Sequence, residues 1–174
     1  NIFDVLGMSS TTYMASKKAD LIGRVAPTEK QPDGSVLLGE VHDPLARVMN
    51  HGNSGNAGVF SSAEDLAVLA AALMNDGEFE GKQVLGKLTV ETMTRVPSEV
   101  KQLGRSLGWD NYSPYASNNG NLFHPTKTFG HTGYTGTSII VDPVSKTSVI
   151  LLTHRVHPVD KGGVVRLRAL VANG

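Results

Sequence analysis

Hydrophobic positions recur at helical spacing in one stretch of this chain and predict its clearest helix. The helix would begin near Ser61, which has the spacing of a capping box with Glu64, and would end near Gly77, where a C-terminal cap is expected. Its apolar stripe comprises Leu66, Leu69, Ala70, Leu73 and Met74. A stripe of this kind is typical of a helix that covers a core with one face.

Three further helical segments are shorter. Residues 1–8 are interpreted as the end of a helix closed by Gly7, and residues 89–96 as a helix stopped by Pro97. Residues 162–172 predict a final helix. Its apolar side would carry Val164, Leu167, Leu170 and Val171. Residues 9–50 are expected to be mostly irregular, and residues 51–58 form a turn region rich in Gly and Asn.

The last third of the chain has the shorter period of β-strands. Thr137 to Val141 and Ser148 to Thr153 predict a hairpin, with turn residues at 142–145. Residues 107–109 predict one more short strand, followed by a polar loop at 112–126. The predicted sheet therefore has few strands: the hairpin and one short neighbour at 107–109.

The order of these elements indicates an α+β fold, an antiparallel sheet flanked by helices. Residues 1–100 would be mainly helix and loop, and residues 101–174 would hold the sheet strands and the C-terminal helix. Val149 to Leu152 is apolar on both faces, which is typical of a central strand paired on both sides. The chain thus lacks a partner for this strand among its own predicted elements.

Composition narrows the classes of partner. The 174 residues are 40% hydrophobic and 18% charged, which is typical of a globular domain. Lys plus Arg and Asp plus Glu are equal at 16 each, so nothing predicts a nucleic acid or an acidic membrane as partner. No apolar run is long enough for a membrane span, and cysteine is absent. Gly52 to Gly58 lacks the Gly-Lys-Ser/Thr of a phosphate loop, and we predict no cofactor.

The densest chemical signal lies at Phe129 to Ser138 (FGHTGYTGTS). Its three glycines pack poorly in a strand but permit a ligand to approach the backbone closely. From composition alone, a β-bulge or a tight corner explains them equally well.

This segment resembles a known motif. His131-Thr132-Gly133, followed by Tyr134-Thr135-Gly136-Thr137-Ser138, resembles the third active-site motif of class C β-lactamases, D-amino peptidases and related esterases. Three other stretches resemble family motifs in the same order: residues 3–8 (FDVLGM, with Val5 for the usual Pro), 57–67 (AGVFSSAEDLA) and 149–158 (VILLTHRVHP). Val41-His42-Asp43 is similar to an element of one branch. The chain is thus identified as a member of the serine β-lactamase and penicillin-binding-protein superfamily.

The resemblance implies a serine hydrolase that passes through an acyl-enzyme with β-lactams, D-amino peptides or small esters. The family's Ser-x-x-Lys nucleophile and its Tyr-x-Asn would both lie before Asn1. We therefore expect this chain to be the C-terminal part of the domain, inactive alone, with the absent N-terminal segment as its partner. That segment would also supply the strand that the sheet lacks. The family also favours a periplasmic or secreted location.

The resemblance also assigns roles within the motif. The Tyr134 backbone N–H would donate to the oxyanion hole, and the strand backbone would support one edge of a small-molecule or peptide substrate. His131 would face the substrate carboxylate or the tyrosine base in place of the usual Lys, with a charge that varies near neutral pH. Thr132 and Gly133 would complete the substrate-binding residues. A ligand-binding relative without catalysis remains the alternative.

Two other residue patterns are weaker candidates for chemistry. Ser98 and Lys101 have Ser-x-x-Lys spacing, and Ser117-Asn118-Asn119 has Ser-x-Asn spacing, but we expect exposed surface residues here because an activated serine needs a buried base. His42, Asp43 and His51 could suggest a metal-dependent hydrolase. We expect a network that stabilises a loop instead, and no metal site.

Overall fold

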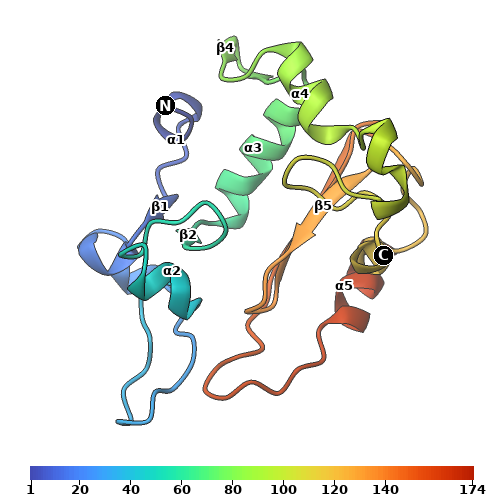
Figure 1. Cartoon of the computed structure of the whole chain (residues 1–174). Helices are drawn as coiled ribbons and strands as arrows, with labels where there is room; N and C mark the ends of the chain where they lie inside the picture. Colours follow the sequence, from blue (N-terminus) through green and yellow to red (C-terminus); the bar gives the residue numbers. More distant parts are fainter.

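The computed structural model describes residues 1–116 and 119–174 and has the α+β architecture expected from the sequence (Figure 1). Its α-helices are α1 (Phe3–Leu6), α2 (Pro44–Val48), α3 (Ala63–Met74), α4 (Lys87–Thr94) and α5 (Val165–Ala172). Short 3-10 helices are η1 (Ala15–Lys17), η2 (Ile22–Arg24), η3 (Ser98–Leu103) and η4 (Pro114–Asn119). The strands are β1 (Thr12–Tyr13), β2 (Val59–Phe60), β3 (Glu78–Phe79), β4 (Lys82–Gln83), β5 (Phe129–Thr132), β6 (Thr137–Asp142) and β7 (Thr147–Leu152).

The main sheet has three strands in the order β5-β6-β7, all antiparallel. The predicted hairpin is confirmed, since Ile139 of β6 pairs with Ile150 of β7 and with His131 of β5. The predicted strand at 107–109 is wrong. Gly108 has a positive φ of 82°, which interrupts the extended backbone that a strand needs. Asp110 instead forms isolated bridges to Arg105 and to Gly130.

The core lies where α3 and α4 cover one face of the sheet. Ala70 and Leu73 of α3 and Val90 of α4 are buried against Phe129 of β5 and Val141 of β6. On its other side, α3 packs against the start of the chain. Leu6 and Met8 are buried there against Ala72, as expected from the helix end that Gly7 closes in a left-handed conformation.

The cap of α3 lies one residue later than predicted. Ser62, rather than Ser61, accepts the Asp65 N–H at 3.2 Å, and Asp65 stands at the third helical position. The Asp65 carboxylate turns away from the cap. It accepts the Ser10 N–H at 2.8 Å and the Thr11 hydroxyl at 2.7 Å, which ties α3 to the chain after α1.

The final helix differs from the predicted amphipathic pattern. Its buried residues are Arg168 and Ala172, whereas Leu167, Leu170 and Val171 are 42%, 58% and 40% exposed. The predicted apolar side therefore faces outward. Likewise β7 is an edge strand among the described residues, and its apolar residues are only half buried.

The remaining differences are small. The helix predicted at 89–96 begins earlier, at Lys87, and ends at Thr94. The irregular region at 9–50 contains α2, whose N-cap Asp43 accepts the Ala46 N–H at 2.7 Å. In the part of the chain that the structure describes, no helix is both long and apolar enough to cross a membrane.

Candidate active site

The His-Thr-Gly segment ends β5 and enters a tight turn to β6. Gly133 and Gly136 close this turn through a Gly136 N–H to Gly133 carbonyl bond of 3.1 Å, and Gly133 N–H donates to the Thr137 carbonyl at 2.8 Å. Tyr134 is the second residue of the turn. The segment thus combines the end of a strand at Thr132 with a tight turn at 133–136.

Close packing restricts both glycines, and Gly136 more strictly. A Cβ at Gly133 would collide with the Thr137 Oγ1, which would have to rotate away. Gly136 has a φ of 125°, and a Cβ there would lie 2.7 Å from the Thr153 carbonyl oxygen. Larger residues would therefore displace the turn. The chain after β7 holds it from outside, since the Arg155 N–H donates to the Thr135 carbonyl at 2.8 Å.

The outer edge of β5 is open beyond Gly130. Gly130 exchanges two backbone hydrogen bonds with Asp110, of 2.8 and 2.9 Å, so its backbone groups face away from β6. By strand alternation the Thr132 N–H and, at the turn, the Tyr134 N–H point to the same edge. Within the described residues the Tyr134 N–H forms no hydrogen bond. It is therefore available to a ligand.

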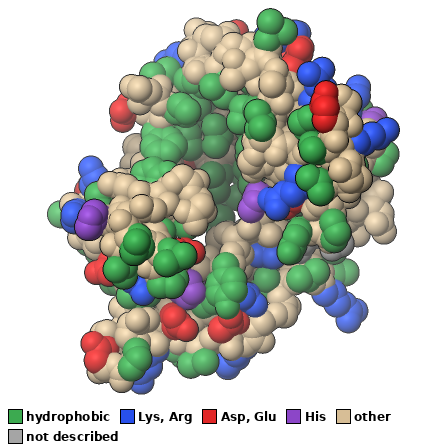
Figure 2. Space-filling view, viewed as in Figure 1, with side chains coloured by type: hydrophobic (Ala, Val, Ile, Leu, Met, Phe, Trp, Pro, Cys, Tyr) green, Lys and Arg blue, Asp and Glu red, His purple; other side chains and the backbone are tan. Residues whose placement is uncertain are grey.

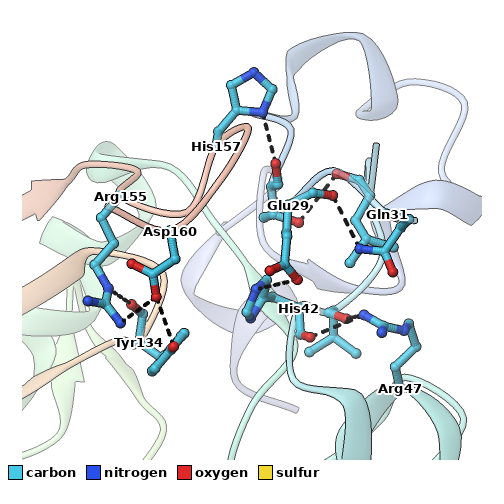
Figure 3. Close-up of polar contacts among 11 residues, drawn as sticks. Glu29, Gln31, His42, Arg47, Tyr134, Arg155, His157 and Asp160 are labelled. Atoms are coloured by element: carbon cyan, nitrogen blue, oxygen red, sulfur yellow. Dashed lines mark hydrogen bonds and ion pairs between the residues drawn. The ribbon is translucent and has the colours of Figure 1, made fainter. Parts of the chain in front are cut away.

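The Tyr134 side chain is held on several sides (Figure 3). Its ring stacks on His42 with centroids 5.6 Å apart, and the Arg155 guanidinium lies 4.3 Å from its centroid on a cation–π contact. Its hydroxyl donates to Asp160 at 2.8 Å, and this bond together with the Asp160 charge raises the pKa of Tyr134 above its ordinary value. Arg155 Nε also donates to the Tyr134 carbonyl at 2.6 Å.

His131 lies at the open edge with both ring nitrogens engaged. Arg105 approaches Nε2 at 3.1 Å, and Nδ1 lies 3.0 Å from the Thr132 carbonyl oxygen. Because a guanidinium only donates and a carbonyl only accepts, Nε2 accepts and Nδ1 carries the proton. The predicted change of His131 charge near neutral pH stays a prediction.

A buried carboxylate fixes Arg105. Its Nε lies 3.1 Å from Asp110 Oδ1, and Asp110 is 5% exposed and also accepts the Ser113 hydroxyl at 2.7 Å. Arg105 was not among the site residues predicted from the sequence. It stands 26 positions before His131, and its only local signal was its place next to a predicted strand that does not form. The motif edge thus carries a cation supplied by Arg105.

The predicted metal candidates do not converge. Asp43 caps α2, and His51 is exposed, whereas His42 faces Tyr134 with its Nε2 3.5 Å from Glu29 (Figure 3). Arg47 holds the same loop by donating to the Val41 and His42 carbonyls at 2.9 and 3.1 Å. In the described part of the chain, no group of three or more His, Cys, Asp or Glu could hold a metal ion.

The Ser98 and Lys101 pair lies elsewhere. Both residues are exposed, as predicted from the sequence, and line an open cavity of about 500 Å³ between α4 and η3. The Ser98 hydroxyl is exposed, as is Lys101, so it has no buried base. Ser117 and Asn118 of the other candidate triplet lie outside the described residues. Among those that are described, no serine hydroxyl bonds a lysine amine or a histidine ring.

The face that Figure 2 presents is hollowed at its centre, and hydrophobic side chains gather in the hollow. In the same view, Figure 1 places this hollow between α3 and β5. The motif strand therefore borders a recess rather than a flat surface, which is the setting of most small-molecule sites.

Comparisons with known proteins agree with this architecture. A sequence profile described as beta-lactamase matches residues 1–173. A protein of Escherichia coli named as a D-alanyl-D-alanine carboxypeptidase is 32% identical over 171 residues, covering 90% of this chain and 39% of that protein. One of Salmonella gallinarum with the same name is 33% identical over 170 residues, with the same coverage. The chain thus spans 39% of the length of these relatives.

Two solved structures share the fold over 99% of this chain. Simvastatin synthase (LovD) from Aspergillus terreus has a TM-score of 0.59 at 16% identity, with 45% of its chain covered. The octameric penicillin-binding protein homologue from Pyrococcus abyssi has a TM-score of 0.58 at 21% identity, with 35% of its chain covered. From the match to the family profile over residues 1–173, this chain belongs to the β-lactamase family.

Proposed function

We propose that this chain forms one wall of the active site of a serine hydrolase, and that a segment outside this chain carries the nucleophile and its base. The observation that supports this most is the Tyr134 N–H, which has no acceptor among the described residues while Arg155 and Asp160 hold the residue in place. A preorganised donor of this kind suits the negative oxygen of a tetrahedral intermediate.

The substrate would lie along the open edge of β5. Thr132 and Tyr134 present backbone donors there, and His131 and Arg105 stand beside them. An extended peptide can add to such an edge as a further strand. The guanidinium of Arg105 suits a substrate carboxylate. Together with the names of the bacterial relatives, this favours D-amino peptides over small esters, with β-lactams as structural analogues of them.

The partner of this wall would be the segment that supplies the serine. β7 offers an unpaired edge, and α5 offers exposed Leu167 and Leu170, both suited to cover by additional chain. We call this chain together with that segment the complete enzyme. A periplasmic or secreted location is proposed with it, where D-amino peptides of the cell wall are found.

The test separates the Tyr134 N–H from the Tyr134 side chain. In the complete enzyme, Tyr134→Pro removes the N–H at a turn position that accepts proline, whereas Tyr134→Phe keeps it. Acylation by a fluorophosphonate should slow about 100- to 1,000-fold in the proline variant and only a few-fold in the phenylalanine variant. Equal rates in the two variants would remove Tyr134 from the oxyanion hole, and no acylation of the complete wild-type enzyme would remove the hydrolase proposal.

The alternative, a ligand-binding protein without catalysis, predicts a different result in the same experiment. A β-lactam or D-amino peptide would bind the complete protein reversibly, and intact mass would show no covalent adduct.

A further inference from the structure

Arg168 of α5 is a buried cation whose partners are unusual. It is 6% exposed, and its Nη2 donates to the Gly133 carbonyl at 2.9 Å and to the Thr137 carbonyl at 2.8 Å. It forms no ion pair with a carboxylate in the part of the chain described, and its Nε lacks a partner. Burial, with repulsion from Arg155 second, lowers its pKa from the ordinary arginine value. A buried charge without a counterion lowers the stability of the fold. Stabilisation alone therefore does not explain why an arginine occupies this position.

The first carbonyl that Arg168 binds belongs to the peptide group of the free donor. The Gly133 C=O and the Tyr134 N–H are two ends of one planar trans peptide, so they point in opposite directions. A guanidinium fixed on the oxygen therefore fixes the direction of the N–H. It also draws electron density toward the oxygen, which strengthens the N–H as a donor because hydrogen bonds through one amide polarise one another.

The second carbonyl closes the turn. The Thr137 oxygen accepts both the Gly133 N–H and Arg168 Nη2. One guanidinium nitrogen thus joins the residue before Tyr134 to the residue after Gly136. The next carbonyl along, that of Tyr134, is held independently by Arg155. The N–H consequently has little freedom to rotate away from the open edge.

We infer that Arg168 is a positioning residue for the oxyanion hole: through the Gly133–Tyr134 peptide it orients and polarises the Tyr134 N–H without touching the substrate. This inference rests on the proposed function, in which that N–H stabilises the tetrahedral intermediate. Arg168 lies on α5, 35 positions after Gly133 and 31 after Thr137, and only the packing of α5 against the turn brings these residues together.

The first test uses the chain itself and needs no catalysis. Arg168→Met keeps an extended apolar side chain and removes the charge and the donors, and Arg168→Lys keeps the charge. Arg166→Met is the matched control, since Arg166 is exposed on the same helix. In amide and carbonyl NMR spectra, Arg168→Met should shift the Gly133 carbonyl and the Tyr134 amide proton upfield, with β6 and β7 resonances retained. Unchanged Gly133 and Tyr134 resonances would overturn the inference.

The second test uses the complete enzyme. Arg168→Met should lower the acylation rate about 10- to 100-fold, less than removal of the donor itself, and should weaken a boronate that mimics the tetrahedral state by the same factor. KM should change little, Arg168→Lys should recover part of the loss, and Arg166→Met should match the wild type. If Arg168→Met acylates normally, the inference fails while the proposed function stands. If the wild type is not acylated, the proposed function fails, and the NMR result still decides whether Arg168 positions the peptide.

Discussion

At the scale of single residues, the candidate site depends on backbone more than on side chains. His131 is the one residue whose side chain was predicted to take part in catalysis, and it lies at the outer edge of β5. Its ring contacts Arg105 and the Thr132 carbonyl. The group without an internal partner is the Tyr134 N–H. Its position is set by glycines that allow the turn and by arginines that bind the carbonyls of the turn. Substitutions that shift the turn should therefore be as harmful as loss of a catalytic side chain.

Gly136→Ala provides a direct measure of this dependence. The added methyl would lie 2.7 Å from the Thr153 carbonyl oxygen, on backbone whose φ of 125° L side chains rarely adopt, so the turn must move and the Tyr134 N–H with it. We expect acylation of the complete enzyme to fall about 100-fold, because small misplacements of catalytic groups have effects of that size. Gly23→Ala is the control, since a Cβ at Gly23 would meet nothing within 4 Å. Equal losses in the two variants, or none in either, would contradict the close packing described for the turn.

At this scale, the motif residues could be predicted from the sequence, but the arginines around them could not. The family resemblance, rather than the hydrophobic pattern, placed the motif on a strand of the sheet, and His131 and Thr132 lie at the end of β5. Arg105, Arg155 and Arg168 could not be given roles, because each reaches the motif only through tertiary packing. Arginines are frequent on surfaces, and nothing local distinguishes one that will bind a buried carbonyl from one that remains solvated.

At the scale of secondary-structure elements, strong local patterns were sufficient and weak ones were not. The β6–β7 hairpin and α3 have clear periodicity and were predicted within about two residues, the usual accuracy of boundaries. The helix α2 was missed because its five residues show almost no periodicity. Its signal was Asp43 before Pro44, an N-cap followed by proline at the first helical turn, and this could have been recognised.

The turn between β6 and β7 makes a prediction about pH. Burial alone would raise the pKa of Asp142, but hydrogen bonds from the Ser145 hydroxyl and N–H, the Val144 N–H and Thr128 hold that pKa below its ordinary value. A carboxyl with a lowered pKa stabilises the fold above its unfolded pKa of about 3.9, and that contribution is lost as the pH falls through the folded pKa.

Asp142→Asn should therefore lower the free energy of unfolding at pH 7 by about 1.5–3 kcal/mol, the range for hydrogen bonds to a charged group. The difference from wild type should shrink as the pH falls below about 4, where the wild-type carboxyl becomes protonated. Urea denaturation at several pH values measures both effects, and the exposed Asp20→Asn serves as control. A difference that stays constant across this pH range would show that the charge of Asp142 is not the stabilising feature.

At the scale of the whole molecule, β7 and α5 expose apolar side chains to solvent. The strand β7, predicted from its two apolar faces to be central, is an edge strand here, and α5 turns its apolar side outward. Sequence reasoning anticipated the first feature from Val149 to Leu152. It missed the second, because the buried position of α5 is occupied by Arg168, which a hydrophobic pattern cannot predict.

This exposure should make the chain associate when studied alone. Sedimentation velocity over a range of concentrations should show self-association, and Leu170→Glu should weaken it by placing a charge on the exposed face of α5. Leu88→Glu alters a comparably exposed leucine on α4, 74% exposed against 58% for Leu170, and should leave association unchanged. A wild-type chain that remains monomeric throughout would contradict this account of α5 and β7.

The central claim, that this chain carries the oxyanion side of a serine hydrolase but not its nucleophile, is tested most directly by intact-mass spectrometry after incubation with a fluorophosphonate and with a reactive penicillin. The account predicts no adduct on this chain alone, and in the complete enzyme one adduct, located on a serine outside this chain. An adduct on Ser98 of this chain, or none in the complete enzyme, would contradict it.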